Sequence, residues 1–199
     1  MTCLRPGPGI EVPPEVVALV DAMAAGFTWA DRDKRQGGCI RAARTGTAVL
    51  AGLGIAARPL AADLLAGNAA LCGTLHGGRD SHGRPVPATS RQTPAGHEIH
   101  WEPGSARHGH VVIVGADWFV DLTVGQAADP PRGIHIDGPM VGPYVAATGT
   151  YAQPLVGGGF VRWWWRPEIA RFRRTPAWRE DVPPAVVDNL LARMSRAVW

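Results

Sequence analysis

A glycine pair and a cysteine stand directly before a helical pattern, and this stretch constrains the chain more than any other. The sequence reads Gly37-Gly38-Cys39, and small or apolar residues then recur at i, i+4, i+7 and i+11 over residues 40–53. Gly54 stands where a glycine commonly ends a helix. We therefore expect a helix over 40–53 that packs closely on a sheet, with Cys39 at its N-terminus.

A cysteine at the start of a helix is a candidate nucleophile. The unpaired N–H groups and the positive end of the helix dipole favour the thiolate, and the same groups can stabilise an oxyanion. The two glycines remove side chains beside Cys39, which lets a substrate backbone approach. The alternative is a buried structural cysteine, because free cysteine is among the most buried residue types.

The composition indicates one globular domain. Of 199 residues, 46% are hydrophobic and 19% are charged, which suits a chain with a buried core. We expect a single domain over residues 1–199, with a catalytic-like core at about 13–160 and a C-terminal segment over 161–199. The net charge is only +3, and no tight basic run with interleaved aromatics precedes residue 160, which weighs against a nucleic-acid partner.

Cysteine usage and hydropathy indicate the compartment. The three cysteines, Cys3, Cys39 and Cys72, are odd in number and irregularly spaced, so we expect no disulfide framework. Residues 1–10 lack the apolar core of a signal peptide, and no run of about 18 apolar residues spans a membrane. We expect a cytoplasmic protein with reduced thiols and no membrane association, in which Cys3 and Cys72 are bystanders.

Helices are also expected near both ends of the chain. Pro13 and Pro14 open the first helix and Gly26 ends it. Its apolar stripe is formed by Val16, Leu19, Val20 and Met23. The last helix occupies residues 182–199 and is amphipathic. Its apolar residues are Val186, Val187, Leu190, Leu191 and Met194.

The intervening segments predict strands and loops. Residues 55–65 predict a strand that is interrupted or placed at a sheet edge because of Pro59. Residues 67–96 are rich in Gly, Ser, Thr, Pro and His and predict a long loop or insertion. Residues 97–102 alternate weakly and predict a strand. The Gly/Pro-rich residues 127–160 predict loops with one or two edge strands.

Residues 107–126 predict a β-hairpin, because two runs rich in β-branched residues flank Gly115-Ala116. A two-residue loop with glycine first fits a type II′ turn. One face of the hairpin is expected to carry Val111, Ile113, Trp118 and Val120. Apolar residues on both faces indicate that the hairpin is buried on both sides.

The turn decides which residues of the hairpin are neighbours. A loop at Gly115-Ala116 places His110 directly opposite Asp121, with Cβ atoms roughly 4.5–5.5 Å apart. A three-residue loop would put the two side chains on opposite faces. His108 lies one step further along the same face and is a rival base, but His110 is the residue that faces Asp121.

Cys39, His110 and Asp121 are the three groups that a thiol catalyst requires. A nucleophilic cysteine needs a base that takes its proton and later protonates the leaving group, and that base needs a third residue to fix its tautomer. The three residues occur in the order Cys, His, Asp.

Three blocks of the sequence resemble the papain-like fold as used by transglutaminase-like proteins. These blocks are Gly-Gly-Cys39 with its helix and Leu53 to Arg58, then Gly109-His110-Val-Val, then Trp118-Phe-Val-Asp121-Leu-Thr123 with Gln126 following. The resemblance covers about residues 37–126. It implies an α+β papain-like (transglutaminase-like) core, in which the nucleophile helix packs on an antiparallel sheet. It also implies that Cys39 attacks an acyl carbonyl, that His110 is general base and acid, and that Asp121 orients His110.

The sequence departs from that pattern at two points. A long insertion separates the Cys block from the His block, and no strong marker identifies the oxyanion donor. Gln36, beside the Cys39 backbone N–H, is a candidate donor, with Gly38 and Gln126 as supporting residues. Arylamine acetyltransferases share the fold, the residue order and a glycine before the cysteine, so the sequence is similar to them as well.

Two other groups of residues are candidate sites. His97 and His100, at i and i+3, point to opposite faces of a strand, and no Cys or acidic residue has ligand spacing, so we expect no metal and no cofactor. The tryptophans at 163–165 with their flanking arginines can stack on a ligand, or alternate along a strand and cover the core. Candidate substrate or partner contacts are Trp118, Trp163, Trp164 and Arg58, whereas Arg171, Arg173 and Arg174 indicate a solvated face.

These observations predict a thiol-dependent hydrolase or acyltransferase that acts on an amide bond, in a peptide or an isopeptide, through an acyl-enzyme on Cys39. The partner is then a peptide or protein substrate, or a small acyl acceptor. Two alternatives remain open. One is arylamine N-acetyltransferase-like transfer from a thioester. The other is a non-catalytic papain-like binding module that holds a partner with its Trp/Arg segment.

Overall fold

The computed structural model describes residues 11–26, 38–68, 71–75, 88–93, 96–101, 110–128, 130, 133–156 and 159–197. The helices are α1 (Pro14–Gly26), α3 (Gly38–Gly52), α4 (Pro176–Arg179) and α5 (Pro184–Ala197), with short 3₁₀ turns η1 (Val124–Ala127), η3 (Ala146–Thr148) and η4 (Arg171–Arg174). The strands are β1 (Arg58–Asn68), β2 (Leu71–Leu75), β3 (Ala88–Thr93), β4 (Gly96–Trp101), β5 (His110–Val114), β6 (Trp118–Asp121), β7 (Met140–Pro143), β8 (Thr150–Pro154) and β9 (Gly159–Trp165).

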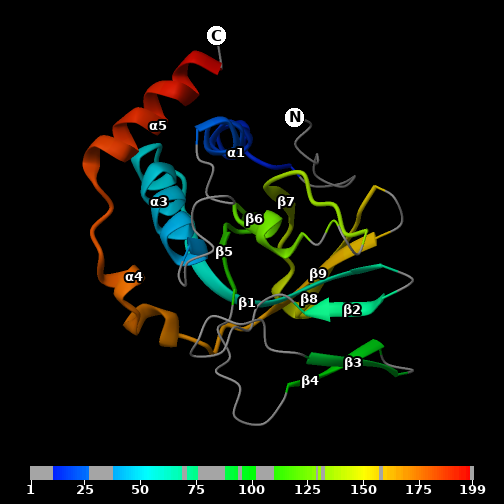
Figure 1. Ribbon diagram of the computed structural model, residues 1–199. Coiled ribbons are helices and arrows are strands. Elements are labelled where there is room, and N and C mark those ends of the chain that lie inside the picture. The colour runs from blue at the N-terminus through cyan, green and yellow to red at the C-terminus, as the bar shows by residue number, and fades with distance from the viewer. Residues whose placement is uncertain are drawn as a thin grey trace.

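The helices lie together beside a curved antiparallel sheet, so the fold is of the α+β class (Figure 1). The sheet order is β7-β6-β5-β1-β9-β8, and β2 also pairs with β1. Strands β3 and β4 form a separate two-stranded sheet. The edge strands β7 and β8 approach each other, so that the sheet is nearly closed. Among the described residues, no helix has both the length and the apolar character required to cross a membrane.

Helix α3 confirms the expected helix and the expected position of Cys39, which is its second residue. Its end is a Schellman motif: Gly54 has φ +76°, its N–H donates to Ala51 O at 3.0 Å, and the Ile55 N–H donates to Leu50 O at 2.9 Å. The glycine is needed here because the left-handed conformation is costly for other residues.

The two predicted terminal helices are also present, and they pack on the same face of the sheet as α3 (Figure 1). The predicted stripe of α1 is fully buried. Leu190 and Met194 of α5 are buried as well, whereas Val186, Val187 and Leu191 are partly buried. These residues form one hydrophobic cluster with the side chains of β5 and β6 that face the helices.

Strand β1 corrects the prediction of an edge strand. It lies in the interior of the sheet, between β5 and β9. Pro59 is tolerated because it lies near the start of the strand, opposite Ile113 of β5, in the part that β9 does not reach. The pairing with β9 begins only at Ala62, so the missing N–H of Pro59 costs no bond to that neighbour.

The β5–β6 hairpin corrects the predicted turn. The Gly115 N–H donates to Trp118 O at 2.9 Å, so the two loop residues are Ala116 and Asp117 rather than Gly115 and Ala116. None of these three residues has a positive φ, so the turn is not type II′. Glycine is required at 115 for space, since a Cβ there would lie 2.2 Å from Trp118 Cε2. The hairpin is nevertheless buried on both faces, as predicted.

The predicted long loop over 67–96 is wrong in part, because β1 extends to Asn68 and the segment also contains β2 and β3. The predicted strand over 97–102 is confirmed by β4. The expectation of one or two edge strands within 127–160 is confirmed by β7 and β8, which lie at the two ends of the sheet order.

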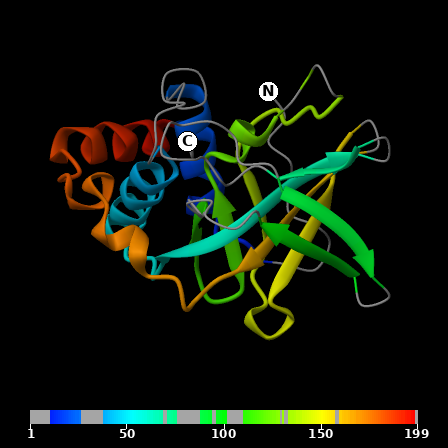
Figure 2. The same ribbon diagram turned by 60° about the horizontal axis from the view of Figure 1, so that its bottom comes forward.

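The C-terminal residues are more deeply integrated than expected. Strand β9, which the sequence placed outside the core at 13–160, lies between β1 and β8. Figure 2 shows β9 as part of the curved sheet. Its side chains alternate, and the buried residues Val161, Trp163 and Trp165 form a second hydrophobic cluster with Phe119. Beyond β9 the chain passes α3 and ends in α5, beside α1.

Candidate active site

The fold brings Cys39, His110 and Asp121 together from three elements. Cys39 is on the first turn of α3, His110 is the first residue of β5, and Asp121 is the last residue of β6. Cys39 is a free cysteine and is partly exposed. His110 is 6% exposed and Asp121 is fully buried. Of the three residues, Cys39 is therefore the one with the greatest exposure to solvent.

His110 and Asp121 form the predicted contact through a different register. Val114 pairs with Phe119, so Asp121 lies opposite Val112, two residues from His110. Because side chains alternate with a period of two, a shift of two residues keeps both groups on the same face. A diagonal neighbour is within reach of a long side chain, and His110 Nε2 lies 2.7 Å from Asp121 Oδ2.

The hydrogen bond to Asp121 leaves the other ring nitrogen of His110 for Cys39. The Cys39 side chain lies close enough to His110 to contribute to the pKa of the imidazole. Burial lowers the pKa of His110, but the charge of Asp121 and its hydrogen bond, together with Cys39, raise the pKa from 6.5 to about 10. The charge of Asp121 and its hydrogen bond thus favour the protonated form of His110.

Asp121 is surrounded by hydrogen-bond donors. Its Oδ2 accepts from His110 and also from the indole N–H of Trp163, at 2.8 Å. Its Oδ1 accepts from the backbone N–H of Thr123 at 3.0 Å, with the Thr123 hydroxyl at 3.5 Å. A buried carboxylate that accepts several hydrogen bonds is stabilised in its ionised form. Hydrogen bonds to both oxygens thus hold the Asp121 carboxylate in place beside His110.

Among the described residues, the space beside Cys39 is too small to hold a water molecule. Its walls are mostly apolar and are formed by residues of α3, β5, β6 and the turn that follows β6. They are Cys39, Ala43, Val111, Val112, Ile113, Val120, Leu122 and Thr123. Charged groups interact more strongly beside such walls than in water, because the effective dielectric constant is lower.

The predicted oxyanion and supporting residues are placed as follows. Gly38 is buried and is the first residue of α3. Gln126 lies in η1, five residues after Asp121, and its side-chain nitrogen is buried with no hydrogen-bond partner among the described residues. Gln36 lies outside the described residues.

The four candidate contact residues occupy different environments. Trp118 and Trp163 are 4% and 0% exposed, so both are core residues rather than surface contacts. Trp164 is half-buried, with the Arg162 guanidinium 5.7 Å from its ring centroid. Arg58 is exposed at the start of β1, where its Nη2 donates to the Tyr144 hydroxyl at 3.5 Å.

Strand β9 shows the predicted alternation: Trp163 and Trp165 are buried, and Trp164 is partly exposed. The arginine-rich η4 segment is exposed apart from Phe172, as expected of a solvated face. The part of the chain with described side chains contains no group of three or more His, Cys, Asp or Glu residues able to hold a metal ion. The side chains of His97 and His100, and all of His108, lie outside that part.

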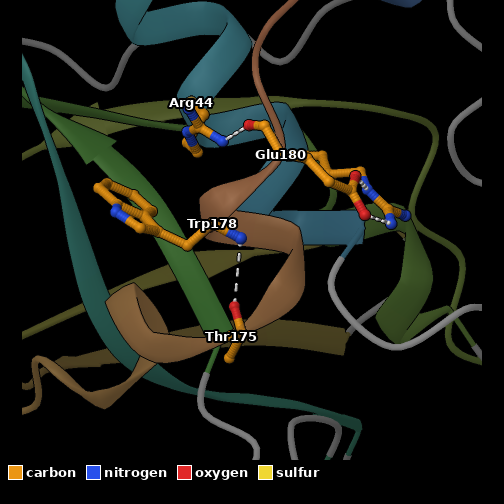
Figure 3. Close-up of polar contacts among 5 residues, drawn as sticks. Arg44, Thr175, Trp178 and Glu180 are labelled. Carbon is orange, nitrogen blue, oxygen red and sulfur yellow. Dashed lines mark hydrogen bonds and ion pairs between the residues drawn. The ribbon is translucent and has the colours of Figure 1, made fainter.

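A second polar network holds the first turns of α3 from the outside. Arg41 Nε and Nη2 donate to the two carboxylate oxygens of Glu180 at 2.6 and 2.8 Å. Arg44 donates to the Glu180 backbone oxygen, and its guanidinium lies 5.4 Å from the Trp178 ring centroid (Figure 3). Arg41 lowers the pKa of the Glu180 carboxyl, with a smaller contribution from Arg44. Thr175 caps the short helix α4 by accepting from the Trp178 N–H.

Sequence reasoning missed the roles of Thr123 and Trp163 in this site. An Asp-x-Thr pattern signals a side chain that accepts from the backbone two residues on, so the Thr123 contact was within reach of the sequence. The Trp163 contact was not, because it depends on how β9 is placed in the sheet.

The chain matches no protein-family model, and no curated protein and no solved structure matches it.

Proposed function

We propose that this chain is a thiol-dependent acyl-transfer enzyme, with Cys39 as nucleophile, His110 as proton donor and acceptor, and Asp121 as the residue that orients His110. One observation carries the proposal. A partly exposed cysteine on the first turn of a helix adjoins a buried histidine whose far nitrogen is held by a buried, fully hydrogen-bonded aspartate. The packing of α3 on an antiparallel sheet supports a papain-like arrangement of these groups.

The chemistry begins with a Cys39 thiolate beside a His110 imidazolium. The thiolate attacks the carbonyl carbon of the substrate, and the π electrons of the carbonyl move onto its oxygen. The N–H groups at the start of α3 have no partners within the helix, so they are available to stabilise this oxyanion. The intermediate collapses by expelling the leaving group, which takes the proton from His110, and an acyl thioester remains on Cys39.

The second half of the reaction releases the acyl group. Neutral His110 takes a proton from water or from an amine as that nucleophile attacks the thioester. The C–S bond then breaks and restores the thiolate–imidazolium pair. Water gives hydrolysis and an amine gives transfer.

We favour amide bonds, in peptides or isopeptides, as the substrate class. An amine leaves only if it is protonated as the C–N bond breaks, and a His110 that holds its proton at neutral pH is suited to that step. Activated esters and thioesters have better leaving groups and depend less on an acid. Protonated His110 is therefore of most use in the cleavage of an amide.

The proposal is tested with two acyl donors that differ in this requirement. Wild-type protein is mixed with p-nitrophenyl acetate and, separately, with peptide p-nitroanilides, and the acyl adduct is located by mass spectrometry. We expect acylation on Cys39 with both donor types, and none on Cys39→Ser at that position. His110→Ala should lose more activity on the anilides than on the ester.

Absence of a Cys39 adduct in folded protein would contradict the proposal. So would ester cleavage at equal rates in wild type and Cys39→Ser. An adduct that forms only from an acyl-CoA thioester would replace the amide with a thioester as the substrate class.

A further inference from the structure

We propose that Trp163 is a positioning residue of this site: its indole N–H holds the carboxylate oxygen of Asp121 that accepts from His110. The inference rests on the proposed function for its consequence in catalysis. The contact itself does not depend on that function: Trp163 Nε1 lies 2.8 Å from Asp121 Oδ2, and His110 Nε2 lies 2.7 Å from the same atom.

The contact is long-range and joins two distant strands. Trp163 lies on β9 and Asp121 on β6, and the sheet order places β5 and β1 between them. The indole N–H therefore reaches Asp121 over the two strands that separate β9 from β6. Trp163 is 0% exposed, so no water competes for its N–H.

The indole ring itself is held by aromatic neighbours. Its centroid lies 4.9 Å from that of Phe119 and 6.0 Å from that of Tyr151, which stacks on it at an interplanar angle of 24°. Close packing restricts the ring to one orientation. The N–H is thus a fixed donor aimed at one oxygen.

Such a donor has two effects on the Asp121–His110 pair. It stabilises the ionised carboxylate, so that the shared proton stays on His110. Together with the Thr123 N–H on the other oxygen, it also stops the carboxylate from rotating away from the imidazole. Without the indole N–H, Oδ2 is held by His110 alone. Cys39 then has a less well aligned partner.

Trp165 provides a matched control. It lies two residues away on the same strand, its side chain is 6% exposed, and its ring centroid lies 5.1 Å from that of Phe119. Its Nε1, however, is buried with no hydrogen-bond partner among the described residues. Trp165→Phe therefore removes the same ring atoms and an unused N–H, whereas Trp163→Phe removes the N–H that Asp121 accepts.

The test measures His110 directly and does not require a substrate. In ¹H–¹⁵N NMR spectra of wild type, we expect a strongly downfield His110 Nε2–H signal from the bond to Asp121. Trp163→Phe should move or broaden that signal, and Trp165→Phe should leave it in place. In parallel, the rate of Cys39 acylation should fall about ten- to a hundredfold in Trp163→Phe, the scale of a small misalignment in a catalytic site, and be unchanged in Trp165→Phe.

Equal effects of the two variants on the His110 signal, or no effect of either, would overturn the proposal and make Trp163 a packing residue only. If wild type shows the His110 signal and its dependence on Trp163 but no acylation, the positioning contact stands and the proposed function fails. Should Trp163→Phe not fold, benzothienylalanine incorporated at position 163 keeps the ring size and lacks the N–H, and the same spectra decide.

Discussion

Two networks of charged residues contact the first turn of α3, and they differ in burial rather than in the distance between the paired charged groups. His110 and Asp121 are separated by 2.7 Å inside the protein, and Arg41 and Glu180 by 2.6 Å at its surface. His110 and Asp121 are 6% and 0% exposed, whereas Arg41 and Glu180 are 29% and 51% exposed. Cys39 of the first network and Arg41 of the second are two residues apart on the same helix turn.

The difference shows that a short distance does not measure the energy of an ion pair. A surface pair is solvated and screened, so its formation changes stability little. A buried pair is expensive to desolvate, and removing one partner leaves an uncompensated charge or unpaired donors in the core. The proposed chemistry therefore depends on the buried network, and the exposed pair joins α3 to the C-terminal segment.

The largest expected effect is that of Asp121→Ala. The change leaves His110, the Trp163 indole N–H and the Thr123 N–H without their acceptor, all in the core. We expect a loss of about 3–5 kcal/mol in the free energy of unfolding, the usual scale for breaking a buried pair, measured by urea denaturation. Glu180→Ala is the surface counterpart and should change stability far less. Equal losses in the two variants would remove the distinction between the networks.

The second expected effect is a pH dependence that only the buried network produces. The pKa of His110 is raised from 6.5 to about 10 in the folded state, so between these values the folded protein holds a proton that the unfolded chain has released. Stability is then fully present below pH 6.5 and falls as the pH rises toward 10, by about 1.4 kcal/mol per pH unit.

This slope is measured by urea unfolding at several pH values between 6 and 9.5 in a Cys39→Ser background, where that thiol does not titrate. Because Cys39 is one of the causes that raise the His110 pKa, the slope should end at a lower pH in this background than in wild type. His110→Gln in the same background should flatten it. If the Cys39→Ser protein and the same protein with His110→Gln lose stability with pH in parallel, His110 titrates in the folded state as it does in the unfolded chain.

The smallest expected effect is that of Glu180→Gln. The lowered pKa of Glu180 means that its contribution is present at neutral pH and is lost as the pH falls through the folded-state value. Because the group is exposed, we expect a slight decrease in melting temperature at low salt that disappears in high salt. The rate of Cys39 acylation should stay within about twofold of the wild-type rate, because the Arg41–Glu180 pair contributes only to the alignment of α3. A large, salt-independent loss of stability would place Glu180 among the structurally essential residues.

The helices were predictable because their signals are local. Prolines, a left-handed glycine and the apolar spacing define α1, α3 and α5, and the observed ends lie within about two residues of the expected ones. The Cys39 position follows directly from the start of α3. These features do not depend on what the helices pack against.

The sheet was less predictable because its features depend on tertiary packing. The hairpin turn lies one residue later than expected, since Gly115 makes room for the Trp118 ring instead of adopting a positive φ. His110 and Asp121 still meet because the resulting shift is of two residues, which preserves the face. The Trp163 contact required the placement of β9 beside β1, about 100 residues away in the chain.

The most direct test of the central claim, that Cys39 and His110 form a reactive pair, is the pH dependence of Cys39 alkylation by iodoacetamide. The rate is followed on the Cys39 peptide by mass spectrometry, in wild type and in His110→Ala, with circular dichroism to show that both are folded. We predict that near pH 7 wild-type Cys39 is alkylated faster than Cys39 of the His110→Ala variant, because a His110 cation stabilises the thiolate. A Cys39 that stays unreactive until the protein unfolds, or an identical profile in the two proteins, would contradict the account.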